Sequence, residues 1–147
     1  MALSIQVVID CADPDKVAHF WADALHYKIQ DPPTGYDSWE AFLQAHHVPE
    51  DQWTRASAIV DPAGKGPRIF FQRVPEAKTV KNRVHLDINA SQLATDPAAS
   101  QAERQQRIIT EAGRLTELGA RELYRMEEFG NLCITMADPE NNEFCVQ

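Results

Sequence analysis

The sequence predicts an α+β fold made of two tandem βαβββ modules, and the main evidence is an internal repeat within its 147 residues. A β-rich run containing Gln6 recurs 79 residues later around His85, and a helix pattern follows each run. Each half also carries an Asp-Pro turn ahead of a strand, at Asp61-Pro62 and at Asp138-Pro139. Landmarks that recur in the same order indicate duplication. A duplicated unit of this kind can close around one cavity, where we expect the functional site.

The elements of the first half follow from local signals. Residues 3–11 predict a strand because they are rich in β-branched residues. Asp13-Pro14 predicts a helix start, with aspartate as N-cap and proline in the first turn. Apolar residues then recur at helical spacing: Val17, Phe20, Trp21, Ala24 and Leu25. Further strands are expected at 27–29, 56–60 and 68–74.

The placement of residues 31–55 stays open, and residues 36–55 are interpreted as an insertion into the repeated core. Asp37-Ser38 could cap a short helix there, and Pro49 would end it because the residue before a proline avoids the helical region. The aromatic residues beside this insertion, Trp53 among them, could cover a cavity and stack on a ligand, or simply pack the insertion onto the sheet.

The second half repeats the pattern. A strand is expected at 83–90, a loop or helix entry at 91–100, and a helix marked by Ile108, Ala112, Leu115 and Leu118. Gly119 occupies the position of a helix C′ glycine. The remaining strands are expected at 120–126, 132–136 and 143–146. One domain over 1–147 follows, with module one at 1–76, a linker at 77–82 and module two at 83–147.

Composition narrows the class of protein. The hydrophobic content of 44% and the charged content of 24% are ordinary for a soluble globular chain. A net charge of −8 argues against binding to nucleic acid or to an anionic membrane, since both require basic patches. The three cysteines, Cys11, Cys133 and Cys145, form no closely spaced pair, which favours free thiols. With no signal peptide pattern at the start, we expect a cytoplasmic protein.

These motifs together resemble the vicinal oxygen chelate superfamily, which includes glyoxalase I, bleomycin resistance proteins and extradiol dioxygenases. The residues that carry the resemblance are Asp13-Pro14, the helix with Phe20-Trp21, the run Lys81–Asp87, Leu118-Gly119-Ala120, and Asp138–Phe144. The chain is especially similar to the glyoxalase-like subfamily. The resemblance implies that the two modules form one curled, cavity-containing barrel-like sheet, usually in a homodimer.

The resemblance also implies four ligand positions on the first and last strands of each module. In the metalloenzymes of the superfamily they carry His, Gln or Glu, and the bound metal acts as a Lewis acid on vicinal oxygens of the substrate. Gln6 and His85 fall at the first-strand positions. Cys145 falls where an acidic ligand is expected, while Glu143 lies two residues earlier on the same side of the strand.

The equivalent last-strand position in module one is ambiguous, because Phe70 and Gln72 share a face and only Gln72 could be a ligand. The expected ligands are therefore Gln6, Gln72, His85 and Cys145, with no carboxylate among them. Such a set could take zinc, nickel or iron, with Gln6 and His85 as the first metal candidates. The predicted ligand cavity is lined by Gln6, Trp53, Phe70, Gln72, His85, Glu143 and Cys145.

Three functions stay open at this stage. The first is a protein that binds a small organic molecule without a full catalytic metal site, as in sequestration or resistance, and the missing acidic ligand favours it. The second is a metal-dependent lyase or isomerase of glyoxalase type acting on a vicinal-oxygen substrate, which the matched Gln6 and His85 favour. The third is an accessory module with a vestigial cavity. Six basic residues between Lys65 and Arg83 could also draw an anionic ligand to the cavity mouth.

Overall fold

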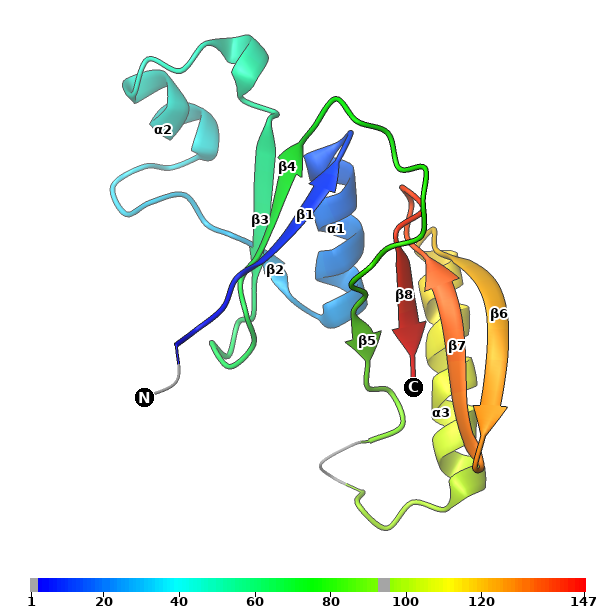
Figure 1. Ribbon diagram of the computed structural model, residues 1–147. Helices are drawn as coiled ribbons and strands as arrows, with labels where there is room; N and C mark the ends of the chain where they lie inside the picture. Colours follow the sequence, from blue (N-terminus) through cyan, green and yellow to red (C-terminus); the bar gives the residue numbers. More distant parts are fainter. Residues whose placement is uncertain (1–2, 93–95) are drawn as a thin grey trace. The chain divides into compact units, whose positions relative to one another are not determined.

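The computed structural model describes residues 3–92 and 96–147, and the chain forms two compact units, Met1–Ala77 (unit 1) and Lys78–Gln147 (unit 2). The predicted α+β class and the two βαβββ modules are confirmed (Figure 1). Each unit holds one four-stranded sheet, and strand pairing in the described residues does not close the two sheets into a barrel. No helix among the described residues is long and apolar enough to cross a membrane.

The sheet of unit 1 has the strand order β1-β4-β3-β2. Its strands are β1 (Val7–Cys11), β2 (Lys28–Ile29), β3 (Ala56–Val60) and β4 (Ile69–Arg73). β1 runs parallel to β4, and the other pairs are antiparallel. The strand predicted at 3–11 is wrong for residues 3–6, because the paired part of β4 begins at Ile69, opposite Val7, and leaves the preceding residues without a ladder partner.

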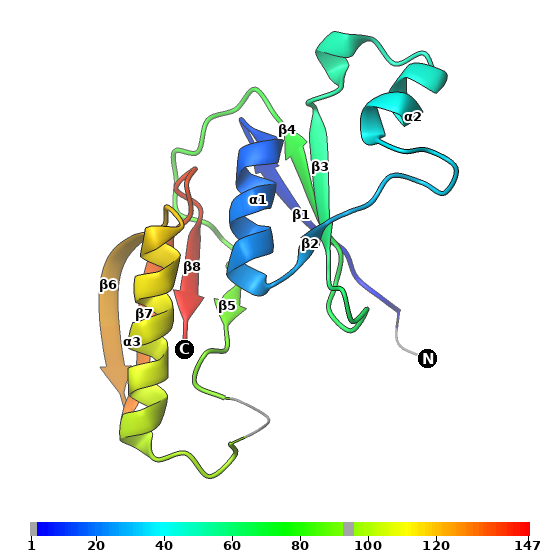
Figure 2. The same ribbon diagram turned by 180° about the vertical axis from the view of Figure 1, so that it is seen from behind.

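Helix α1 (Pro14–Leu25) covers one face of this sheet, as Figure 2 shows from behind. Its start is the one predicted: the Asp13 side chain accepts a hydrogen bond from the Lys16 backbone N–H at 3.2 Å, and Pro14 occupies the first turn. Val17 and Trp21 are almost completely buried. The helical spacing therefore did identify the face that packs on β3 and β4.

The insertion contains helix α2 (Trp39–Ala45), capped by Ser38 as predicted, and a 3₁₀ turn η1 (Glu50–Gln52). None of the residues in these two elements is buried. The aromatic rings of this segment pack on one another instead: the Phe42 ring lies 5.1 Å from Tyr36 and 4.1 Å from His46 between centroids. The segment is thus a small cluster of its own.

The sheet of unit 2 has the order β5-β8-β7-β6, with the same connections as unit 1. Its strands are β5 (Asp87–Ile88), β6 (Arg121–Glu128), β7 (Asn131–Ala137) and β8 (Glu143–Val146). The strand predicted at 83–90 is wrong except for Asp87 and Ile88. Only Cys145 and Val146 of the four-residue β8 pair with β5, so the residues before Asp87 have no ladder partner.

Helix α3 (Gln101–Glu117) covers one face of the second sheet (Figure 2). Ser100 and Glu103 form a reciprocal capping box at its start, and Gly119 follows its end with φ +110°, a conformation that favours glycine. The predicted connection at 91–100 is described only in part, because residues 93–95 lie outside the described residues.

The aspartates of the two repeated Asp-Pro motifs accept hydrogen bonds from backbone N–H groups. Asp61 accepts hydrogen bonds from the backbone N–H groups of Ala63, Lys65 and Gly66 at 2.8–2.9 Å. The Asp138 carboxylate does the same for Glu140 and Asn142 at 2.9 Å. These aspartates hold the tight turns that precede the last strand of each module, so they are structural residues.

Candidate functional site

Each sheet has one face covered by its helix and one face turned away from it. In unit 1 the residues that face α1, such as Ile69 and Phe71, are at most 2% exposed. Residues of a strand alternate between faces, so Val8, Phe70 and Gln72 lie on the opposite side. In unit 2, Ile134 and Val146 are completely buried and Cys145 lies on the other face. Of the expected site residues, Phe70, Gln72 and Cys145 therefore lie on the helix-free faces.

Three side chains with metal-binding atoms meet on the helix-free face of unit 2. His85, Asp87 and Cys145 each offer one ligand atom, and these atoms all lie within 4.8 Å of one another. His85 Nε2 lies 3.3 Å from Asp87 Oδ1, and both side chains are partly exposed, at 42% and 38%. Cys145 is 9% exposed. The cluster is thus closed on the cysteine side and open to solvent on the other.

Strand pairing explains why these residues meet. β5 runs parallel to β8, and Asp87 is the direct partner of Cys145. His85 precedes Asp87 by two residues, which brings it to the same side of the chain. His85 and Cys145 were predicted from the sequence, and Asp87 was not. The spacing in the sequence could have revealed Asp87, because residues two apart in an extended segment point to the same side.

The donor set of this cluster fits zinc better than the predicted set did. Zinc binds Cys sulfur, His nitrogen and carboxylate oxygen, and catalytic zinc sites combine three protein ligands with an open position. A thiolate and a carboxylate would balance the charge of a divalent cation. The predicted ligand set contains no carboxylate, whereas Asp87 adds one beside His85 and Cys145 in this cluster.

A second thiol borders the cluster from β7. Burial raises the pKa of Cys133 to about 11, with further contributions from a hydrogen bond to Cys145 and from the charges of Cys145 and Asp87. The Cys133 thiol is therefore protonated at neutral pH. Thr135 on the same strand has its hydroxyl 3.6 Å from Cys145 Sγ. Both groups can hydrogen-bond to the Cys145 sulfur.

The two glutamines of unit 1 do not form a ligand pair. Gln6 Oε1 accepts a hydrogen bond from Arg68 Nη1 at 2.6 Å, and Gln72 Nε2 donates one to Asp10 Oδ1 at 2.7 Å. Gln72 lies four residues beyond Arg68, or about 13 Å along a strand. The two amides are therefore engaged by different partners, and nothing in unit 1 brings them together as a ligand pair.

The Glu143 side chain contacts the segment that precedes β5. Its carboxylate accepts the backbone N–H of Asn82 at 3.0 Å and lies 2.9 Å from Lys78 Nζ. These contacts lower the pKa of Glu143 to about 2 against the burial of the group, with the Asn82 hydrogen bond as the larger cause. Glu143 therefore has a structural role in unit 2.

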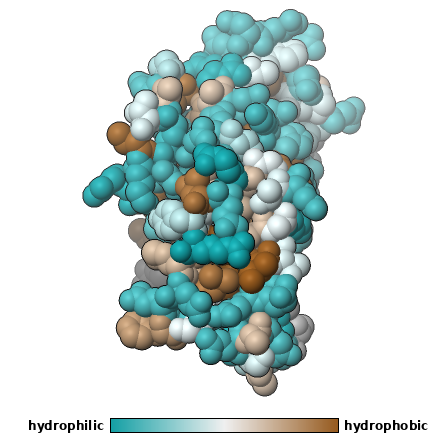
Figure 3. Space-filling model, turned by 90° about the vertical axis from the view of Figure 1, so that its right-hand side faces the viewer, coloured by the Kyte–Doolittle hydropathy of each residue, from teal (hydrophilic) through white to brown (hydrophobic). Residues whose placement is uncertain are grey.

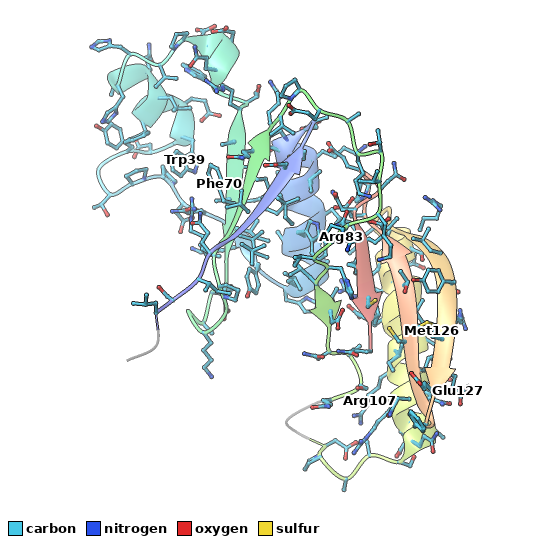
Figure 4. The ribbon with its side chains drawn as sticks, viewed as in Figure 1. Trp39, Phe70, Arg83, Arg107, Met126 and Glu127 are labelled. Carbon is cyan, nitrogen blue, oxygen red and sulfur yellow. The ribbon has the colours of Figure 1, made fainter. Side chains whose placement is uncertain are left out.

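The predicted aromatic cavity residues lie in unit 1. Phe70 is half-buried below the Arg68 guanidinium, whose carbon is 5.1 Å from the ring centroid. Trp53 donates its indole N–H to the Val48 carbonyl at 2.8 Å, within the insertion. Figure 4 shows Phe70 on β4 and Trp39 on α2. The prediction that Trp53 faces a ligand stays untested.

A separate cavity of about 630 Å³ lies in unit 2 beside the start of α3 and the tip of the β6–β7 hairpin. Its lining includes Arg104, Ile108, Phe129, Leu132, Cys133 and Gln147. None of the seven predicted cavity residues lines it. Cys133 links this cavity to the cluster of His85, Asp87 and Cys145, because the same thiol contacts Cys145.

Comparison with known families gives one match over nearly the whole chain. The sequence profile described as "Glyoxalase-like domain" matches residues 6–147. No curated protein matches the chain significantly.

Solved structures share the fold at low sequence identity. A point mutant of the FosX fosfomycin resistance protein of Listeria monocytogenes, complexed with Mn(II) and 1S,2S-dihydroxypropylphosphonic acid, has a TM-score of 0.60 and 11% identity, covering 100% of this chain and 90% of that one. A possible glyoxalase from Bacillus cereus has a TM-score of 0.60 and 10% identity, covering 100% and 99%. A glyoxalase/bleomycin resistance protein/dioxygenase family enzyme from Burkholderia phytofirmans has a TM-score of 0.57 and 12% identity, covering 96% and 94%.

Proposed function

This chain belongs to the glyoxalase-like domain family, and from that membership and the His85, Asp87 and Cys145 cluster we propose that it binds a divalent metal and acts on a small organic molecule. The observation that carries the proposal is the meeting of three different ligand types within 4.8 Å. The resemblance to the vicinal oxygen chelate superfamily is confirmed by the family match and by the structural neighbours.

The cluster is suited to a metal that still accepts a ligand. His85, Asp87 and Cys145 would hold the ion, and the open side of the cluster would leave one position for an oxygen of the substrate. A divalent cation supplies Lewis-acid chemistry when bound, because it polarises a carbonyl or similar oxygen. The FosX mutant was crystallised with Mn(II), so the fold is compatible with a divalent metal. Zinc is the first candidate here, because Cys145 is a softer ligand than manganese prefers.

The surrounding residues would keep the ligands in place. Thr135 and the protonated Cys133 thiol can hydrogen-bond to the Cys145 sulfur and so hold it in position. Asp87 lies against His85 and favours an imidazole orientation that points Nε2 toward the cluster. On these grounds we propose a lyase or isomerase of glyoxalase type that acts on a substrate with vicinal oxygens.

The first experiment is metal binding to protein purified without chelator and then loaded with zinc. We expect one zinc per chain, and at least a tenfold loss of affinity in His85→Ala, Asp87→Asn and Cys145→Ser, measured by competition with a chromophoric chelator. His19→Ala is the matched control, because His19 forms another exposed pair with an aspartate, Asp15, at 3.4 Å but belongs to no described three-ligand cluster.

Cobalt(II) provides a readout that does not depend on activity. A cobalt-loaded site with a thiolate ligand absorbs by sulfur-to-metal charge transfer, and Cys145→Ser should remove this band while His19→Ala keeps it. Wild-type protein that takes up no metal, or variants of all three cluster residues that bind zinc as tightly as wild type, would refute the metal-dependent function. Circular dichroism of each variant checks that unit 2 is folded.

A second candidate is a small-molecule binder without a catalytic metal, as in a bleomycin resistance-like protein. The observation that favours it is the engagement of Gln6 by Arg68, which removes the first-strand ligand of unit 1. This function predicts ligand binding that is unchanged after chelator treatment and in His85→Ala. Loss of ligand binding on metal removal would exclude it.

The homodimer is also a proposal. Edge strand β6 is exposed along its whole length, and it presents Leu123, Tyr124 and Met126 to solvent at 36%, 47% and 53% exposure. Figure 3, viewed from the side of β6, shows hydrophobic residues among hydrophilic ones. An exposed edge strand with apolar side chains is suited to pairing with a second copy of the chain.

A further inference from the structure

Arg68 is held in a fixed position on the helix-free face of unit 1. Its Nε donates to Gln30 Oε1 at 2.7 Å and its Nη1 donates to Gln6 Oε1 at 2.6 Å. The guanidinium carbon lies 5.1 Å from the Phe70 ring centroid. These three contacts come from different parts of unit 1, so together they fix both the position and the plane of the guanidinium.

No carboxylate among the described residues forms an ion pair with this cation. Within residues 3–92 and 96–147, Arg107, Arg114 and Arg125 each pair with an aspartate or a glutamate, whereas Arg68 forms no ion pair. Its partners are two neutral amide oxygens and an aromatic ring. The described residues therefore orient the positive charge of the Arg68 guanidinium without pairing it with an anion.

The guanidinium also has donors to spare. Arginine carries five N–H groups, and the contacts with Gln30 and Gln6 use two of them. The Nη2 amino group makes no hydrogen bond with the described residues, and Nη1 keeps one N–H. Two neighbouring donors of this kind match the two oxygens of a carboxylate, or two oxygens of a phosphate or phosphonate, in a bidentate contact.

Apolar surface lies beside the cation. Val8 pairs with Phe70 across β1 and β4, and its side chain is 47% exposed. Trp39, at the start of α2, donates its indole N–H to the Gln30 carbonyl at 2.7 Å, so the insertion adjoins the residue that holds Arg68. Figure 4 shows Trp39 on α2 and Phe70 on β4. The surroundings suit an anion with a flat or apolar body.

We infer that Arg68 binds the anionic group of a small organic ligand, a carboxylate or a phosphate-type group, and that Gln6 and Gln30 are positioning residues for it. The inference rests on the small-molecule binding in the proposed function and does not depend on the metal. It also gives Gln6 a different role from the predicted one, since its oxygen orients a cation of the protein in place of a metal ion.

The test is an NMR titration of ¹⁵N-labelled protein with benzoate, with phenyl phosphate and with uncharged benzamide. The two acids should shift the Arg68 Nε–H signal and the side-chain amide signals of Gln6 and Gln30, and benzamide should shift them far less. Arg68→Gln should weaken binding of the acids at least tenfold. Arg73→Gln is the matched control: Arg73 ends β4, the strand that begins directly after Arg68, its side chain lies on the opposite face, and it donates to the Ala12 carbonyl.

Whichever acid binds more tightly identifies the anion class. Acids that bind Arg68→Gln as tightly as wild type, or that leave the Arg68 Nε–H signal of the wild type unmoved, would overturn the inference, and the second of these results needs no variant to fold. His85→Ala separates the two proposals. Anion binding that persists in this variant supports the Arg68 site whatever the outcome of zinc loading, and absence of zinc uptake would refute the metal proposal alone.

Discussion

Replacing Glu143 by glutamine tests whether this residue stabilises unit 2 or belongs to the metal site. Its carboxylate receives the Asn82 backbone N–H at 3.0 Å and the Lys78 ammonium at 2.9 Å, and the side chain is 17% exposed. The variant keeps the shape of the side chain but removes the charge. We therefore expect a loss of stability with zinc binding unchanged.

The magnitude follows from the pKa. Glu143 has its pKa lowered from 4.5 to about 2. One pKa unit corresponds to about 1.4 kcal/mol, so the full shift amounts to about 3 kcal/mol at neutral pH. Glutamine still accepts one hydrogen bond and the pair is partly solvated, which reduces the expected loss to about 2 kcal/mol. Because the folded pKa lies below the unfolded one, this stabilisation is present above about pH 5 and is lost as the pH falls toward 2.

The assay is urea unfolding followed by far-UV circular dichroism at pH 7, 5 and 3. The signal should not be tryptophan fluorescence, because Trp21, Trp39 and Trp53 all lie in unit 1. The gap between wild type and Glu143→Gln should be equal at pH 7 and 5 and fall by about half at pH 3. Glu122→Gln, at an exposed ion pair with Arg125, is the control and should cost less than about 1 kcal/mol. A gap that does not change with pH, or that only matches the control, would refute the reasoning.

The remaining predictions concern turns, glycines and the β6 edge. Asp61→Ala should lower the urea midpoint of unit 1 at pH 7. Backbone hydrogen bonds lower the pKa of Asp61, so the difference from wild type should shrink once the pH falls below the usual pKa of an aspartate. A difference that persists in acid would contradict this. Gly119→Ala should destabilise the protein by about 1 kcal/mol because φ is +110°, whereas Gly113→Ala, inside α3 with no atom within 4 Å of the added carbon, should stabilise it by about 0.5–1 kcal/mol. Thermal unfolding compares the two, and a loss in both would show that crowding of α3 dominates. Met126→Glu should convert the proposed homodimer to monomer in analytical ultracentrifugation, and an unchanged sedimentation coefficient would exclude the β6 edge as the interface.

Local signals were enough to predict most elements. Asp13-Pro14 predicted the start of α1, Ser38 the start of α2, and Gly119 the end of α3. These predictions succeeded because caps and helical faces depend on residues within about four positions of one another. The strands at 56–60 and 143–146 also have the predicted bounds, since short apolar segments beside turn signals leave few alternatives.

The failures all involve partners that are distant in the sequence. The β propensity of residues 83–90 is real, yet β5 is only two residues long because β8 offers it only two partners. Likewise, nothing near Gln6 in the sequence indicates that Arg68, 62 residues away, takes its side-chain oxygen. Propensity describes a residue's own conformation, while strand length and hydrogen-bond partners depend on what lies alongside.

The sequence by itself determined the duplicated βαβββ architecture, the family and two of the three residues of the candidate metal cluster. Periodicity, caps and Asp-Pro turns act over a few residues, so one chain is enough to read them. Only the tertiary structure decided that Asp87 joins His85 and Cys145, because that meeting requires the parallel pairing of two strands 58 residues apart. The same holds for Arg68, whose unbalanced charge appears only once Gln6, Gln30 and Phe70 surround it.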